Sequence, residues 1–324
     1  MPRVSLKTWN CFGAAQTIRA FLFSKEPPDP RRFELRAIRE QVESVDIVCL
    51  QELFVPRAEG FFDRLAHPFK HRVPNGSTLW PLTFGGSGLG IASRFPIVTQ
   101  TFRTFSPPSV LSERFARKGL LHARIALPGD GAPQLDVITT HMQSGYDVAA
   151  ERVRERQIRE LRAFADQVGA VDRPLIVCGD LNIDGLLGAR DREYATLAQA
   201  LSGFEDVGAS DDRPTFHPHP DVNPLAHRFE AGSPKQRIDY VFYRPAVTDM
   251  LRVQGSRLAL DAPFHEEGAA VTFASDHFAI RVDLEVAESI SERASLSKSE
   301  LLSVAIADQP PAGTPLMQTP TPKP

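Results

Sequence analysis

The feature that most constrains the fold of this chain is a series of short apolar runs of strand length. The run at 45–52 (VDIVCLQE) is almost continuously apolar, as expected of a central strand that is buried on both faces. Helical patterns lie between some of the runs. Apolar residues recur at three- and four-residue spacing in 31–44 and 149–168, and a third helix is expected at 191–202. The strand-like runs are 4–10, 45–52, 88–93, 120–127, 135–141, 175–180, 237–243 and 278–286.

This mixture of strands and helices predicts an α/β fold in which β-sheets pack face to face with helices outside. A chain of 324 residues is long enough to bury a sizeable core. After about residue 287 the sequence becomes rich in serine and alanine and ends in QPPAGTPLMQTPTPKP. We therefore predict a folded domain at 1–287 and a Ser/Pro-rich, disordered tail at 288–324.

Net charge, cysteine content and the length of the apolar runs narrow the possible partners and the location of the protein. The formal net charge of -3 argues against a polyanion as the main partner, although a local basic groove is compatible with it. The three cysteines lie in or beside apolar runs, which predicts reduced core thiols. The N-terminal segment lacks the apolar stretch of a signal peptide, and no apolar run is long enough to span a membrane. We expect a soluble protein, cytoplasmic as the sequence stands, or secreted if a signal peptide has been removed.

Polar residues gather where the predicted strands end. Strand ends in layered α/β folds open into clefts, and ligands bind there. These strand-end residues are Asn10, Gln51, Glu52, His141, Gln143, Asp180, Asn182, Asp276 and His277.

Several of these side chains suit the hydrolysis of a phosphate ester. Such a reaction needs a cation, a base that prepares water, and hydrogen-bond donors for the charge that develops on the phosphate. Carboxylate and amide oxygens are the ligands that Mg²⁺ prefers, and histidine transfers protons near neutral pH. Taken singly, each residue also has a structural interpretation; Gly-Asp-Leu-Asn at 179–182, for example, is turn chemistry.

Eight segments of the chain stand out as motifs: WNCFG (9–13), CLQELF (49–54), GLGIASRFPI (88–97), RKGLLHARI (117–125), THMQS (140–144), CGDLNID (178–184), QRIDYVFY (236–243) and SDHFAI (275–280). Their order and spacing resemble the endonuclease/exonuclease/phosphatase superfamily. The resemblance covers roughly residues 4–286 and implies that 1–287 form a catalytic domain of this type. It implies a four-layer sandwich of two central mixed β-sheets flanked by helices.

Within that superfamily, three connecting segments are most similar to neutral sphingomyelinases. They are THMQS, RKGLLHARI, and TFHPHPDVNPLAHRF (215–229) followed by QRIDY. This resemblance implies an in-line attack of water on sphingomyelin, which releases ceramide and phosphocholine. The alternatives are a nuclease or a hydrolase of another phosphoester, such as an inositol phosphate, on the same metal site.

The resemblance also implies roles for the residues that transfer protons and bind the phosphate. His277 would be the general base, oriented by Asp239. Asp180 would position the attacking water. Asn182 and His141 would donate hydrogen bonds to the phosphate oxygens.

A divalent cation site follows from the same resemblance. Mg²⁺, or Mn²⁺ or Co²⁺ in its place, would bind around Glu52, with Asn10 nearby and Asp276 at the edge of the site. Lys118 would contact the phosphate. The alternative is a catalytically silent binding module on the same fold. Such a module would be expected to have lost at least one of four residues, none of which is missing: Glu52, Asp180, Asp239 and His277.

The expected partner is a phospholipid at a membrane surface, with nucleic acid less favoured and no stable protein partner inferred. A membrane-active enzyme needs apolar side chains that reach the lipid. The candidates are FLF (21–23) and LWPLTF (79–84), for which ordinary core or loop packing is the alternative.

Overall fold

The computed structural model describes residues 3–13, 30–74, 78–79, 82–83, 86–107, 116–129, 133–209, 212–247, 251–265 and 273–286. Two six-stranded mixed sheets form the centre of this part of the chain. The first sheet has the order β13 (Leu251–Ala259), β14 (Ala279–Val286), β1 (Arg3–Asn10), β2 (Ile47–Gln51), β6 (Gly90–Ser93), β3 (Phe69–Arg72). The second has the order β11 (Glu205–Asp206), β12 (Asp239–Arg244), β10 (Leu175–Asp180), β9 (Gln134–His141), β8 (Gly119–Ala126), β7 (Ile97–Thr104).

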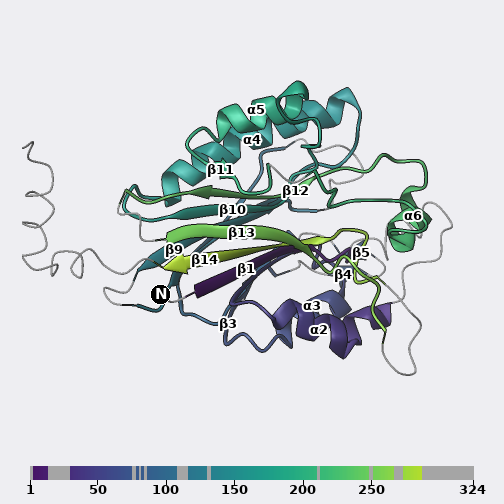
Figure 1. Ribbon diagram of the computed structural model, residues 1–324, viewed down its shortest axis with the longest axis horizontal. Helices are drawn as coiled ribbons and strands as arrows, with labels where there is room; N and C mark the ends of the chain where they lie inside the picture. The colour runs from purple at the N-terminus through teal and green to yellow at the C-terminus, as the bar shows by residue number, and fades with distance from the viewer. Residues whose placement is uncertain are drawn as a thin grey trace, which may run out of the picture. The chain divides into compact units, whose positions relative to one another are not determined.

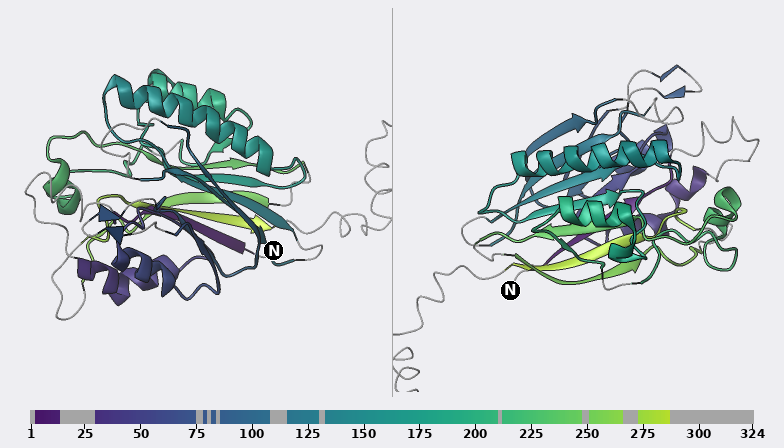
Figure 2. Two further views of the ribbon diagram at one scale, coloured as in Figure 1. Left: turned by 180° about the vertical axis from the view of Figure 1, so that it is seen from behind. Right: turned by 90° about the horizontal axis from the view of Figure 1, so that it is seen from above.

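Helices cover the outer face of each sheet (Figure 1). On the first sheet lie α2 (Arg36–Glu43) and α3 (Pro56–Asp63), and on the second lie α4 (Val148–Val168) and α5 (Arg192–Ala200). Figure 2 shows α4 and α5 side by side over their sheet. The remaining short elements are η1 (Pro30–Glu34), η3 (Gly188–Arg190), α6 (Pro224–Glu230) and a small hairpin of β4 (Thr78–Leu79) and β5 (Leu82–Thr83).

Three apolar clusters account for this layering. Side chains of both sheets, such as Leu6 and Val137, fill the space between the sheets. Ile38 of α2 packs with residues of β1 and β2, and Leu161 of α4 packs with residues of β9 and β10. Burial of these faces drives the assembly of the layers, so the predicted four-layer α/β sandwich is confirmed.

The register of the strands brings their ends together. In the parallel pair β9 and β10, His141 lies opposite Asp180, and in the antiparallel pair β10 and β12, Asp180 lies opposite Asp239. In the parallel pair β1 and β2, Asn10 lies opposite Gln51. Predicted site residues that are far apart in sequence therefore occupy one end of the sandwich.

The predicted helices at 149–168 and 191–202 match α4 and α5, and Asp147 and Asp191 cap their N-termini with side-chain hydrogen bonds. The helix predicted at 31–44 is wrong in its first turns. A 3-10 turn, η1, is followed by α2, which begins only at Arg36. The cause is a tertiary contact: the Arg32 guanidinium is buried against backbone carbonyls of two other segments.

Other expectations concern segments that the structure does not describe in full. The division of the chain near residue 287 stays a prediction, because 287–324 lie outside the described residues, as do 21–23. In 79–84 only the backbone of the β4–β5 hairpin is described. Among the helices described, none combines the length and the apolar character needed to cross a membrane.

Candidate active site

Asp180, at the end of β10, is the residue around which the predicted site residues gather. Its carboxylate accepts a hydrogen bond from the Asn10 side chain, with 2.9 Å between Nδ2 and Oδ2. His141 Nε2 lies 3.4 Å from the same Oδ2, and His277 Nε2 lies 3.9 Å from it. The Asp180 side chain is almost completely buried, so these charges interact with little screening by solvent.

Asn10 joins this centre to the acidic residue that was predicted to bind the cation. Its Nδ2 also lies 3.3 Å from Glu52 Oε1, so one amide group bridges two carboxylates. Its Oδ1 accepts a hydrogen bond from the Phe12 backbone N–H at 3.0 Å, which fixes the orientation of the amide. The structure thus brings Asn10, Glu52 and Asp180 together.

His277 and Asp239 form a hydrogen-bonded pair. His277 Nδ1 lies 2.8 Å from Asp239 Oδ2, and both side chains are buried. The bond favours the imidazole tautomer that carries its proton on Nδ1. In that tautomer Nε2 is left as the proton acceptor and faces Asp180.

Burial and the clustered carboxylates shift the pKa values of these groups strongly. Burial, together with the charge of Asp239, raises the pKa of Asp180 to about 7. Burial lowers the pKa of His141 well below its usual range, and the positive charges of Lys118 and His277 act in the same direction. Burial opposes the charged form of His277, but the neighbouring carboxylates, above all Asp239, raise its pKa well above the usual value.

The backbone is strained where it presents two of these residues. Glu52 and Asn182 have φ angles of 64° and 53°, in the left-handed region that few residues other than glycine adopt. Asn182 suits that conformation, and its N–H donates to Asp180 Oδ1 at 3.0 Å in an Asx turn. Strain of this kind costs about 1–3 kcal/mol for each residue and often marks functional sites.

Two predicted phosphate-binding residues converge on one backbone carbonyl. Asn182 Nδ2 and Lys118 Nζ donate to Met142 O, at 3.2 and 2.6 Å. Both polar groups therefore lie beside His141, whose neighbour along the chain is Met142. Their roles as phosphate ligands stay predictions.

The Ser-Asp-His segment that precedes β14 is held by contacts that sequence reasoning missed. Ser275 Oγ lies 2.6 Å from the carbonyl oxygen of Asn10 and accepts a hydrogen bond from His277 N–H. Asn223 Nδ2 donates to the carbonyls of Ser275 and Asp276, at 3.0 and 3.2 Å. These bonds fix the backbone of the segment that carries Asp276 and His277. The motifs around Ser275 and Asn223 were visible in the sequence, but nothing in them indicated these contacts.

The donor set fits a divalent cation. Glu52 and Asp180 offer hard oxygen atoms, which Mg²⁺ prefers. Asp239 Oδ1 is buried and has no hydrogen-bond partner among the described residues. The predicted cation ligands were Glu52, Asn10 and Asp276. The His, Cys, Asp and Glu atoms that converge within 4.8 Å in the described structure belong instead to Asp180, Asp239 and His277.

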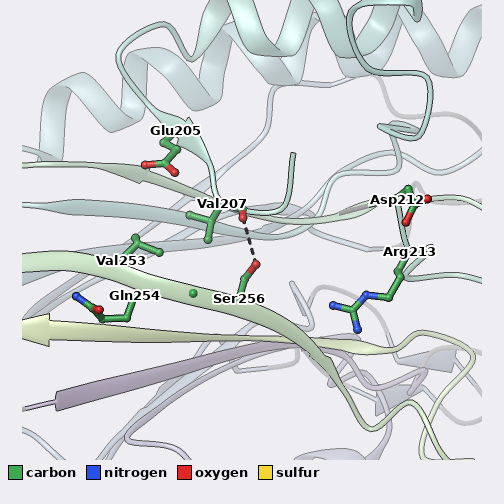
Figure 3. Close-up of a pocket in the computed structure, with 8 residues that line it drawn as sticks. Glu205, Val207, Asp212, Arg213, Val253, Gln254 and Ser256 are labelled. Carbon is green, nitrogen blue, oxygen red and sulfur yellow. Dashed lines mark hydrogen bonds between the residues drawn. The ribbon is translucent and has the colours of Figure 1, made fainter. Parts of the chain in front are cut away.

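A separate hollow lies at the open edge of the sandwich and holds none of these residues. It has a volume of about 510 Å³ and lies between β13 and the segment that follows β11 (Figure 3). Ser256 Oγ donates to Val207 O across it, at 3.1 Å. The predicted catalytic residues lie at the strand ends and not in this hollow, so we place the candidate active site at the strand ends.

Comparison with known proteins decides the family. The model of the endonuclease/exonuclease/phosphatase family matches residues 8–277. The chain belongs to this family. It is therefore a hydrolase of the endonuclease/exonuclease/phosphatase type, and the predicted membership is confirmed.

A curated relative and several solved structures extend the comparison. Mouse sphingomyelin phosphodiesterase 5 is 28% identical over 318 residues, which cover 81% of this chain but only 62% of the relative. Sphingomyelinase C of Streptomyces griseocarneus shares the fold with a TM-score of 0.65 and 22% identity, covering 87% of this chain and 99% of that one.

Two further solved structures with this fold differ in what they hold. A beta toxin structure from Staphylococcus aureus with bound magnesium ions has a TM-score of 0.66 at 18% identity, covering 87% of this chain and 99% of that one. D. rerio TDP2, complexed with a single-strand DNA product, has a TM-score of 0.63 at 19% identity, covering 88% of this chain and all of that one. Structures at this identity show the shared fold and leave the substrate open.

Proposed function

We propose that this chain is a Mg²⁺-dependent phosphodiesterase that hydrolyses sphingomyelin to ceramide and phosphocholine. The observation that carries the hydrolytic part is the hydrogen-bonded pair of Asp239 and His277, with His277 Nε2 3.9 Å from Asp180 Oδ2. The lipid part rests on the similarity to sphingomyelin phosphodiesterase 5 over most of the chain.

His277 takes the proton from the attacking water. Its Nδ1–H donates to Asp239, so Nε2 accepts the proton, and the Asp239 carboxylate stabilises the imidazolium that forms. A water molecule hydrogen-bonded to both Nε2 and Asp180 Oδ2 would be oriented by two fixed acceptors. Such positioning lowers the entropic part of the barrier.

The oxygens of the phosphate carry negative charge that grows as water attacks. His141, Asn182 and Lys118 line the same end of β9 and β10 and donate hydrogen bonds to these oxygens. Mg²⁺ held by Glu52, with Asn10 and Asp276 beside it, would supply a positive charge that offsets the charge of the phosphate and of the carboxylates. The same charge would oppose the carboxylates that keep His277 protonated, which favours the neutral imidazole that a base requires.

A nuclease is the second candidate, because D. rerio TDP2, which shares this fold, is complexed with a single-strand DNA product. The net charge of -3 argues against it, since phosphate contacts along a nucleic acid need a basic surface. The two candidates use the same catalytic residues and differ in the surface that receives the leaving group.

The test compares the two substrate classes under the same conditions. Purified protein is incubated with sphingomyelin liposomes, and separately with single- and double-stranded oligonucleotides, in the presence of Mg²⁺. We expect release of phosphocholine and intact oligonucleotides. Cleavage of oligonucleotides without phosphocholine release would show that the protein is a nuclease and not a sphingomyelinase. His277→Ala should abolish the activity, while His71→Ala, on the edge strand β3, is the matched control.

A further inference from the structure

The segment Thr215–Phe216 joins the strand that carries Asp239 to the segment that carries His277. Phe216 forms an isolated β-bridge with Gln236 on one side and another with His277 on the other. Asp239 begins β12 in the second sheet, and His277 precedes β14 in the first. A backbone of two residues thus links the two sheets at the point where the catalytic pair meets.

Thr215 makes the hydrogen bonds that set this link. Its Oγ1 accepts from the backbone N–H groups of Ile238 and Asp239, both at 3.1 Å. Its carbonyl oxygen accepts from Phe278 N–H at 2.7 Å. The Thr215 side chain is buried, so no solvent competes for these bonds. Thr215 therefore binds the backbone of Asp239 through its hydroxyl group. Through its carbonyl group it binds the backbone of Phe278, the residue that follows His277.

Phe216 supports the imidazole ring itself. Its ring centroid lies 5.3 Å from that of His277, with 51° between the planes. Its own side chain is buried with Ala226 and Ile238. This packing restricts rotation of the imidazole, so a hydrogen bond of fixed direction to Asp239 is maintained.

We propose that Thr215 is a positioning residue for the Asp239–His277 pair, acting through the Asp239 backbone and not by contact with substrate. The proposal rests on the proposed hydrolytic function of that pair. Removing the hydroxyl leaves two buried N–H groups without an acceptor, and the strand end that carries Asp239 then shifts. A misplacement of about 1 Å in an active site lowers the rate by roughly 100-fold.

The test is Thr215→Val, which keeps the shape but removes the acceptor, compared with Thr215→Ser, which keeps the hydroxyl. We expect Thr215→Val to lower kcat by about 10- to 100-fold with KM little changed, and Thr215→Ser to stay near wild type. Thr215→Ala replaces the valine variant if that variant does not fold. Ser256→Ala, which removes the hydroxyl bond between the two sheets at the open edge, is the matched control and should retain full activity.

Two further measurements separate positioning from a general loss of structure. In the background of Asp239→Asn, Thr215→Val should cause little additional loss, because both changes act on the same pair. In NMR spectra, the His277 Nδ1–H resonance, assigned by its loss in Asp239→Asn, should shift in Thr215→Val and persist in Thr215→Ser.

The proposal is overturned if Thr215→Val retains both kcat and the resonance, if Thr215→Ser is as impaired as Thr215→Val, or if the losses of the double variant simply add. Activity is measured on sphingomyelin and on bis(p-nitrophenyl) phosphate, so an error in the lipid assignment does not remove the assay. If wild type hydrolyses neither, the proposed function fails, and the resonance still decides the role of Thr215.

Discussion

His277 Nδ1 lies 2.8 Å from Asp239 Oδ2, although the two residues belong to segments of different sheets. The pair exists only because the two sheets are packed face to face and joined at that end by bridges through Phe216. The site therefore forms only when both sheets of the sandwich are assembled.

Asp239→Asn should keep the shape of the site but reverse the proton arrangement. An amide that donates to His277 Nδ1 forces the proton onto Nε2, which then cannot accept a proton from water. We expect kcat to fall by about 100- to 10,000-fold with the fold intact. Steady-state kinetics and circular dichroism check this. Asp166→Asn, at an exposed ion pair of α4, is the control and should have no effect.

Glu52→Gln should weaken the binding of the divalent cation that we assign to this residue. Losing one carboxylate near a metal lowers its affinity, so half-maximal activity should need at least about tenfold more Mg²⁺. Thermal stabilisation by Mg²⁺ should decrease in parallel. Glu40→Gln, in an exposed ion pair of α2, should change neither quantity. Unchanged Mg²⁺ dependence in Glu52→Gln would move the cation toward Asp180, Asp239 and His277.

Gly179→Ala should destabilise the protein strongly. Gly179 has a φ of +133°, and an added Cβ would lie 2.0 Å from Thr140 O on the neighbouring strand. Relief of that overlap would separate β9 from β10 next to His141 and Asp180, so we expect a loss of about 3 kcal/mol or more in the free energy of unfolding. Denaturant unfolding provides the measurement. Gly255→Ala has open space around the new methyl group and should be nearly neutral.

Lys7→Met should change how stability depends on pH. Burial, with the nearby charges of Arg281 and Arg257, lowers the pKa of Lys7 from 10.5 to about 8. Between pH 8 and pH 10.5 the unfolded chain binds more protons than the folded one, so the free energy of unfolding rises with pH in this range. Below pH 8 the charged, buried lysine destabilises the fold. This destabilisation disappears as the pH rises toward 10.5. The largest effect is of order 3 kcal/mol.

We therefore expect the stability of wild type, relative to Lys7→Met, to rise between pH 8 and pH 10. Burial raises the pKa of the Cys11 and Cys49 thiols, so their titration acts in the opposite direction, and comparing the two proteins cancels that contribution. Urea unfolding at pH 7.5, 9 and 10 checks the difference. A difference that stays constant, or that grows in favour of the methionine variant, would contradict the shift.

Much of the central architecture was predictable because buried strands leave an almost continuous apolar run. The strands β2 and β10 are fully buried and were located from that pattern. The edge strands β7 and β13 were missed, because most of their residues are partly or fully exposed and alternate irregularly. Whether such a segment forms an edge strand depends on the neighbouring strand with which it pairs, and the local sequence does not show that pairing.

For the site, the strand-end polar residues were predicted, and the structure brings them together. What could not be predicted is the support around them. The hydroxyl of Thr215 and the guanidinium of Arg32 bind backbone groups of segments far away in sequence. Such hydrogen bonds leave no periodic pattern and no recognisable neighbouring residue in the sequence, so they cannot be predicted from it. Arg32 was read as part of a helix for this reason.

The most direct test of the central claim is the hydrolysis of sphingomyelin in water labelled with ¹⁸O and containing Mg²⁺, followed by mass spectrometry of the products. If water attacks the phosphorus at the site of Asp180, Asp239 and His277, the phosphocholine released will carry one ¹⁸O, and EDTA will stop its formation. Unlabelled phosphocholine, or none at all in the presence of Mg²⁺, would contradict the account.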